Sequence, residues 1–229
     1  MGFKKNIAIS LFTFISLLSS PIISGQNITK EVHSSEKDKK TQSSDDILEL
    51  EFDENISHPK IGNNQKAIIQ AFQQAQAKRL DDFAQKQNKD CVHVELMRNK
   101  EVIVVTIGSD CLFAPNATTL SPTADAYLQP FMPFFKTPDL YKILLVMHSD
   151  DTGSQEYTLW LTEMRVNAIY DWFEHAQLDI STLVPYAMGD SDPLLPNNSR
   201  KNRQKNRRLE IYLVPGSAMI SKAKAGTLR

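Results

Sequence analysis

The most constraining feature of this sequence is a short run, Ile143 to Met147, in which every residue is apolar. A strand with one wet face alternates apolar and polar side chains, so an unbroken run is typical of a strand covered on both faces. Such a strand belongs inside a sheet that carries further layers. Leu209 to Val214 predicts a second strand, and Leu183 to Met188 a shorter one that Pro185 weakens.

Upstream of these strands, Cys91 to Gly108 predicts a β-hairpin with its turn at Asn99, because the second arm is rich in β-branched residues. The two cysteines of the chain are Cys91 and Cys111. A turn at Asn99 places Cys91 opposite residue 107, so a disulfide to Cys111 would need a bulge or a diagonal reach. Bridged and free cysteines both stay open at this point.

Helical spacing of apolar residues predicts helices over Gln65 to Lys86 and Gln155 to Ala176. A third helix is expected to begin at Ser121 and to be split by two prolines, Pro130 and Pro133. The order of hairpin, helix, strand, helix, strand and strand predicts an α+β fold, one sheet with helices packed on it, over residues 90–215.

The N-terminal region has the parts of a secretory signal peptide: two lysines, an apolar run from Ile7 to Ile23 and small residues at its end. We expect residues 1–25 to be removed after Gly25, with a retained membrane anchor as the alternative. The protein is then exported, to the periplasm or the outer membrane. No cysteine near the cleavage point offers a site for lipid attachment.

Between the signal peptide and the predicted domain, residues 26–60 are polar and charged, which predicts a flexible linker. Residues 61–89 are expected to form an amphipathic helix that lies on the next domain or contacts another envelope protein. Residues 216–229 are a basic tail that we expect to be frayed.

Composition excludes several classes of function. Lys and Arg number 26 against 27 Asp and Glu, so the chain lacks the basic excess of a nucleic-acid-binding domain. Two distant cysteines exclude a cysteine-rich zinc module. Phosphate-loop, dinucleotide and nucleophile-elbow motifs are absent from the sequence, and we expect no cofactor.

The densest polar cluster, His148 to Glu156, follows the apolar strand. Thr152 and Gln155 fit a capping box, which interprets part of this cluster as a helix start. The acids Asp150, Asp151 and Glu156 allow an alternative interpretation as a cell-wall hydrolase. A metal site is disfavoured, because no second histidine stands at helical spacing.

A single arginine and a cluster of basic residues are further candidates for function. Arg165 lies close to the apolar stripe of its helix, where it needs a carboxylate from the protein or a ligand unless its head reaches water. The cluster from Arg200 to Arg208 is interpreted as a solvated loop or a contact to anionic groups of the wall.

Five segments in order resemble the OmpA-like C-terminal domain (the OmpA/MotB type), over roughly residues 105–215. They are His148-Ser149-Asp150-Asp151-Thr152-Gly153, Tyr157, Leu161-Thr162-Glu163-Met164-Arg165, Gly189-Asp190-Ser191-Asp192-Pro193 and Asn206-Arg207-Arg208-Leu209-Glu210-Ile211. Phe113, Asn116 and Leu120 resemble its upstream segment. The sequence departs from the family pattern at Met147, Ser149, Thr158, Trp160 and Val166.

The resemblance implies a β-α-β-α-β-β sandwich with a mixed sheet that binds peptidoglycan and is not an enzyme. It implies that Asp150 and Arg165 grip the diaminopimelate of the stem peptide, an acid for the ammonium and a planar guanidinium for the carboxylate. Ser149, Leu161, Phe113 and Asn116 would line the same pocket. A membrane-anchored, stator-like wall-binding protein is the other alternative, although the N-terminal run has no acidic residue to conduct ions.

Overall fold

The computed structural model describes residues 62–87 and 91–229. The predicted signal peptide and linker lie outside the described residues. Five strands form one sheet: β1 Val92–Met97, β2 Val102–Gly108, β3 Tyr141–His148, β4 Leu183–Gly189 and β5 Arg208–Pro215. The helices are α2 Asn63–Ala84, α3 Ser109–Leu112, α4 Asp125–Leu128, η1 Gln129–Phe135, α5 Gln155–His175, α6 Arg200–Asn206 and α7 Ser217–Lys224.

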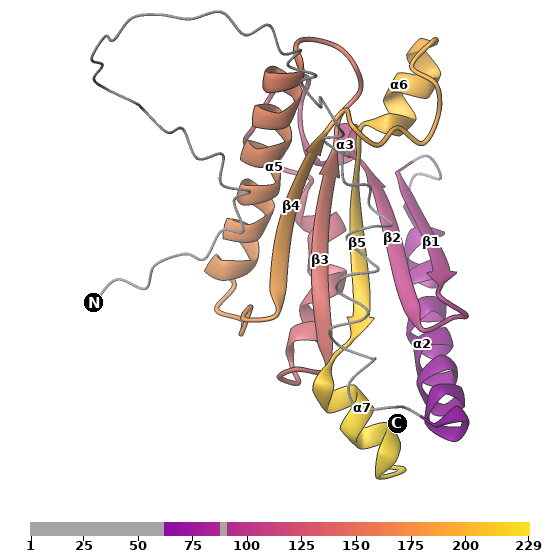
Figure 1. The fold of residues 1–229 in the computed structure, drawn as a ribbon. Helices are drawn as coiled ribbons and strands as arrows, with labels where there is room; N and C mark the ends of the chain where they lie inside the picture. The colour runs from indigo at the N-terminus through magenta and orange to yellow at the C-terminus, as the bar shows by residue number, and fades with distance from the viewer. Residues whose placement is uncertain (1–61, 88–90) are drawn as a thin grey trace, which may run out of the picture. The chain divides into compact units, whose positions relative to one another are not determined.

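The strands lie in the order β1-β2-β5-β3-β4 (Figure 1). Only β3 and β4 are parallel; the other neighbours are antiparallel. This mixed sheet with helices confirms the α+β prediction. The apolar run Ile143–Met147 lies in β3, one strand from the edge, and its buried side chains face both sides of the sheet. Pro185 lies in the edge strand β4, the position where a missing backbone donor is tolerated.

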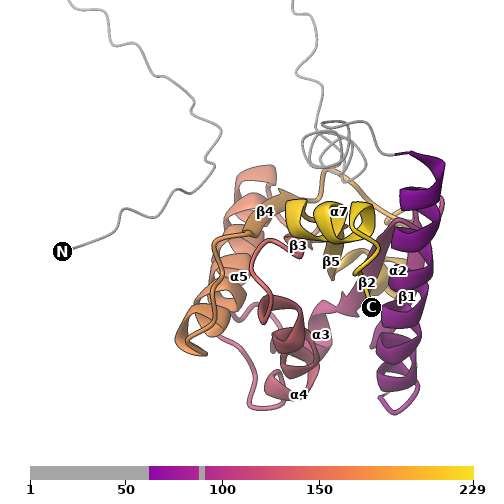
Figure 2. The ribbon, with the colours of Figure 1, turned by 90° about the horizontal axis from the view of Figure 1, so that it is seen from below.

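One face of the sheet carries the main core. Alternate residues of the central strands, such as Val105, Leu145 and Ile211, contact the helices on that face. Val105 and Leu145 both pair with Ile211, so this row crosses three strands. Figure 2, which views the sheet from below, shows α5 and α2 on either side with α3 and α4 between them. The helix predicted from Ser121 begins later, at Asp125, and continues as the 3-10 helix η1, where Pro130 and Pro133 lie.

The disulfide is present, but it is formed neither through a bulge nor by a diagonal reach across the hairpin. Cys91 and Cys111 are bonded, with their Cα atoms 6.1 Å apart. The hairpin register is shifted by one residue from the expected one, since Val92, and not Cys91, pairs with Ile107. The chain then turns into the four-residue helix α3, which brings Cys111 back to the start of β1. A helical turn therefore replaces the bulge or diagonal reach.

The tail was predicted to be frayed, and that prediction is wrong. Ser217–Lys224 forms helix α7, in which Met219, Ile220 and Ala223 are buried. These three residues lie on one helical face, and α7 packs against α2 and β3 at the lower end of the sheet (Figure 1). The burial of these three apolar side chains stabilises the tail as a helix, which the basic residues around them do not do.

Helix α2 lies on the domain, as one of the two interpretations of this segment expected. Its buried side chains include a fully buried glutamine, Gln73. The Nε2 of Gln73 donates to the carbonyls of Glu101 at 2.8 Å and Leu213 at 3.1 Å. The hydroxyl of Tyr141 donates to Gln73 Oε1 at 3.1 Å. One amide thus ties α2 to β3, to β5 and to the turn before β2.

Replacing Gln73 with leucine is expected to lower the free energy of unfolding by about 2–3 kcal/mol, because it leaves buried polar groups without partners. The matched control is Gln74→Leu, the same change at the next, exposed position. Urea unfolding checks this. Equal losses in the two variants would contradict the role given to the buried amide.

Candidate functional site

The site assembles where the ends of three strands are in register. Arg208, the first residue of β5, pairs with Gly108 at the end of β2 and with His148 at the end of β3. The segments that follow or precede these residues therefore lie side by side: Ser149–Ser154 after β3, helix α3 after β2, and helix α6 before β5. The polar cluster predicted from the sequence thus meets residues far from it in the chain.

Asp150 is buried, with 4% of its surface exposed, and its carboxylate is held on both oxygens. The backbone amide of Thr152 donates to Oδ1 at 2.9 Å, and Arg207 Nη1 donates to Oδ2 at 2.6 Å. Burial alone would raise the pKa of this carboxyl, but the hydrogen bonds from Arg207 and Thr152 outweigh it. The pKa of Asp150 consequently lies below its usual value, and the group is ionised at neutral pH.

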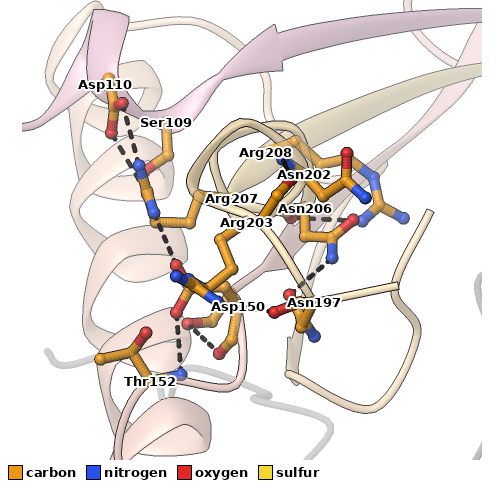
Figure 3. Close-up of polar contacts among 12 residues, drawn as sticks. Ser109, Asp110, Asp150, Thr152, Asn197, Asn202, Arg203, Asn206, Arg207 and Arg208 are labelled. Atoms are coloured by element: carbon orange, nitrogen blue, oxygen red, sulfur yellow. Dashed lines mark hydrogen bonds and ion pairs between the residues drawn. The ribbon is translucent and has the colours of Figure 1, made fainter. Parts of the chain in front are cut away.

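Arg207 joins two carboxylates. It donates to Asp150 and also to Asp110 in α3, where its Nη2 lies 3.2 Å from Oδ2 (Figure 3). The two acids raise the pKa of Arg207 above its usual value, against the lowering effect of burial. Asp110 and Arg207 were not among the predicted site residues. The signals for Arg207 were its place in the Asn206-Arg207-Arg208 segment and in the basic cluster from Arg200 to Arg208.

Arg165 extends from α5 and is equally buried, at 4% exposure. Its Nε donates to the carbonyl of Ala117 at 2.8 Å, and its Nη1 donates to Ser109 Oγ at 2.9 Å. The guanidinium carbon lies 4.9 Å from the ring centroid of Phe113. Burial lowers the pKa of Arg165, and Asp110, Tyr157 and Asp150 act against that effect.

The structure holds Asp150 and Arg165 with different partners. Asp150 bonds to Arg207, while Arg165 bonds to Ser109 and to the segment after α3. Ten residues of helix rise by about 15 Å, so Arg165 lies well down α5 from the loop of Asp150. The two groups lie at the ends of one charged row, linked through Arg207, Asp110 and Ser109.

The other predicted residues surround this row. Phe113 is buried beneath the guanidinium, and Asn116 is exposed with a φ of 57° in the segment whose carbonyls bind Arg165. Ser149 precedes Asp150 and donates to the carbonyl of Asp150 at 3.0 Å. Leu161 is buried one helical turn before Arg165. The capping box is wrong: Ser154 caps α5 by accepting from the amide of Tyr157 at 3.2 Å.

The basic cluster is only partly solvated. Arg208 has 2% of its surface exposed, and its Nε donates to Glu210 Oε1 at 2.7 Å. Asn206, also buried, bonds to both backbone groups of Leu195 and to Asn197 Oδ1 (Figure 3). The solvated interpretation is therefore wrong for Arg207 and Arg208, because each is paired with a carboxylate. Arg200 and Lys201 are exposed, as expected, but they lie in helix α6 and not in a loop.

Beside the site, a buried network predicts loss of stability in acid. Glu210 accepts from Arg208 and from the hydroxyl of Tyr212 at 2.6 Å, and lies 3.4 Å from His148 Nε2. Burial would raise the pKa of Glu210, but these partners lower it from 4.5 to about 2. Burial also lowers the pKa of His148 below 6.5. Both groups bind protons more readily in the unfolded chain.

The free energy of unfolding is therefore expected to fall below pH 6.5 as the unfolded histidine protonates, and more steeply between pH 4.5 and about 2. Urea unfolding at a series of pH values measures this. In Glu210→Gln, a protein already less stable at pH 7, the loss of stability below pH 4.5 should become smaller, and Asp150, whose pKa is also lowered, accounts for part of what remains. Stability that is unchanged or rises on acidification would contradict the assignment.

Within residues 62–87 and 91–229, no group of His, Cys, Asp and Glu side chains is arranged to hold a metal ion. In the same part of the chain, no helix is long and apolar enough to cross a membrane.

Curated relatives resemble about half of the chain. Outer membrane protein A of Bordetella avium is 26% identical over 110 residues, which are 48% of this chain and 57% of that protein. Outer-membrane lipoprotein YfiB of Pseudomonas aeruginosa is 28% identical over 107 residues, 47% of this chain and 64% of that protein. The chain thus spans less than two thirds of the length of either relative.

Solved structures share the fold over a longer stretch. A MotB-like protein from Desulfovibrio vulgaris superposes with a TM-score of 0.58 at 25% identity, covering 66% of this chain and 95% of that one. The cell wall anchor of the T6SS from Pseudomonas aeruginosa superposes with a TM-score of 0.51 at 23% identity, covering 61% and 96%. The family model of the OmpA family matches residues 112–207, which include β3, α5, β4 and α6. The similarity to the OmpA family is thus confined to this part of the chain.

Proposed function

We propose that this protein binds peptidoglycan non-covalently through the diaminopimelate of the stem peptide, and so anchors an exported envelope protein to the cell wall. The OmpA-family domain supports this assignment, and one structure of the same fold is described as a cell wall anchor. Relatives named as an outer membrane protein and an outer-membrane lipoprotein support a place in the periplasm or at the outer membrane.

The observation that carries the proposal is the separation of two buried, oppositely charged groups that do not neutralise each other. The side-chain end of diaminopimelate is a zwitterion, with an ammonium and a carboxylate on one carbon. Asp150, whose pKa is lowered, offers a carboxylate for the ammonium. Among the described residues, Arg165 uses three of its five N–H groups on Ala117, Ser109 and Ala114, which leaves two for the carboxylate.

The affinity of such a site depends on its hydrogen bonds to the charged groups of the ligand. Hydrogen bonds to charged groups contribute about 1.5–3 kcal/mol each. Two or three of them give a reversible attachment, which suits a protein that holds a polymer without cutting it. Because Arg165 and Asp150 are already fixed by neighbouring groups, little side-chain entropy is lost on binding.

The alternative function, a wall hydrolase, needs a carboxylic acid with a raised pKa to protonate the leaving group. The three acids of that hypothesis have other properties. Asp150 has a lowered pKa and is paired with Arg207. Glu156 is fully exposed in the first turn of α5 and also has a lowered pKa, and Asp151 is exposed in the loop. These properties favour binding over catalysis.

A protein partner for the N-terminal part belongs to the same proposal. The buried face of α2 is occupied by the domain, so a partner that contacts residues 61–89 has the polar outer face of that helix to bind. The stator-like alternative differs in keeping residues 1–25 as an anchor, which sequencing of the mature N-terminus decides.

Sedimentation with purified sacculi tests the proposal. The protein is expected to sediment with intact sacculi and to stay in solution with sacculi whose stem peptides have been removed by an amidase. Equal retention on stripped sacculi would contradict a peptide site. Soluble fragments released from intact sacculi would favour the hydrolase.

A further inference from the structure

A pair of exposed aromatic side chains lies on the first turns of α5, beside the proposed site. Tyr157 and Trp160 have 36% and 48% of their surface exposed, and their ring centroids are 5.9 Å apart. Met164, one turn further along, is 41% exposed. Together these three residues, here called the aromatic step, form an apolar strip along a helix whose other face is buried in the core.

The N-terminal end of the aromatic step lies beside the charged groups of the site. Tyr157 is eight positions before Arg165, about 80° around α5, so the two residues lie on neighbouring parts of the helix surface. The ring of Tyr157 also lies against Gly153, in the loop that carries Asp150. A Cβ added at Gly153 would be 2.8 Å from Cδ1 of that ring, and the φ of Gly153 is +117°. Tyr157 therefore adjoins the proposed binding site, and Trp160, whose ring lies against that of Tyr157, extends the apolar strip from it.

We infer that Tyr157 and Trp160 stack against a sugar ring of the glycan strand from which the bound stem peptide hangs. The inference rests on the proposed function and extends its ligand from the peptide to the glycan. A pyranose presents a face of C–H groups between polar edges. An aromatic ring, apolar on its face and beside water, is suited to cover such a surface.

The length of the ligand fits this placement. Two residues and a short acyl group separate diaminopimelate from the sugar, a span of about 10 Å when extended at 3.3–3.6 Å per residue. Along the axis of α5, Trp160 is displaced by about 7.5 Å and Tyr157 by about 12 Å from Arg165, at 1.5 Å per residue. A stem peptide held at Arg165 can thus bring its sugar to the aromatic step.

The experiment compares two ligands that differ only in the sugar: a diaminopimelate-containing stem peptide and the same peptide attached to its disaccharide. The full-length wild-type protein is expected to bind the disaccharide peptide about 5- to 10-fold more tightly. Trp160→Ala should bring the two affinities together and leave the dissociation constant of the free peptide within about twofold of wild type. Leu159→Ala is the matched control, because Leu159 is the next residue and is also 48% exposed.

The possible results distinguish the sugar contact from the peptide-binding site. Equal affinity of the wild-type protein for the two ligands, or an unchanged preference in Trp160→Ala, would overturn the sugar contact while the peptide site stands. The second of these results would leave the aromatic step to another occupant, such as a partner protein. Binding of neither ligand to the wild-type protein would overturn the proposed function itself, and the sugar contact with it.

Discussion

Removing both charged groups of the site, in Asp150→Ala/Arg165→Ala, is expected to reduce affinity for sacculi by at least about 100-fold. Each substitution deletes hydrogen bonds to a charged ligand group worth about 1.5–3 kcal/mol, and about 1.4 kcal/mol corresponds to a factor of ten. The measurement is the bound fraction in a sedimentation series with rising amounts of sacculi. Undiminished retention of the double variant would defeat the site assignment.

A matched control separates this effect from general loss of charge. Asp151→Ala/Arg200→Ala also removes one acid and one arginine, but both are exposed residues outside the charged row. It should bind like wild type. Because Asp150 and Arg165 are buried and the double alanine variant can lose stability, Arg165→Lys is a second probe. It keeps the charge and loses the planar fork, so a roughly tenfold loss of affinity with an intact fold is expected.

Loss of the disulfide is the second large effect expected. The bond between Cys91 and Cys111 closes a loop with a sequence separation of 20 residues. Constraining a loop of that length in the unfolded chain stabilises a protein by about 3 kcal/mol. Cys91→Ser/Cys111→Ser should lower the free energy of unfolding by about this amount, measured by urea unfolding.

The same variant should also bind sacculi less well, since α3 carries Ser109 and Asp110, which contact Arg165 and Arg207. The control is reductant. It should destabilise the wild-type protein and leave the double serine variant unchanged. A double serine variant as stable as the oxidised wild type would contradict a stabilising role for the bond.

Patterns within short segments predicted most of the fold. The β-branched arm of the hairpin, the apolar run of β3 and the helical spacing of α5 depend on residues close in sequence, and all three are observed. The tail was missed because Met219, Ile220 and Ala223 make only two turns, whose helical state depends on packing against distant α2.

The sequence indicated Asp150 and Arg165 as members of the candidate site, but it did not indicate the residues that hold them. Asp150 and Arg165 were identified by resemblance, but the partner that holds Asp150, Arg207, lies 57 positions away in sequence. No periodic pattern links the two residues, because their contact depends on the register of β5 between β2 and β3. The disulfide was left open for the same reason: the four-residue helix α3 is too short to leave a pattern.

The central claim is that the site binds a zwitterion, with Asp150 taking its positive group and Arg165 its negative one. Titration of the protein with two stem peptides, identical except for diaminopimelate or lysine at the third residue, tests it most directly. Lysine keeps the ammonium and lacks the carboxylate, so we expect its peptide to bind at least about tenfold more weakly, and Arg165→Lys to reduce this difference. Equal affinity of the wild-type protein for the two peptides would contradict the account.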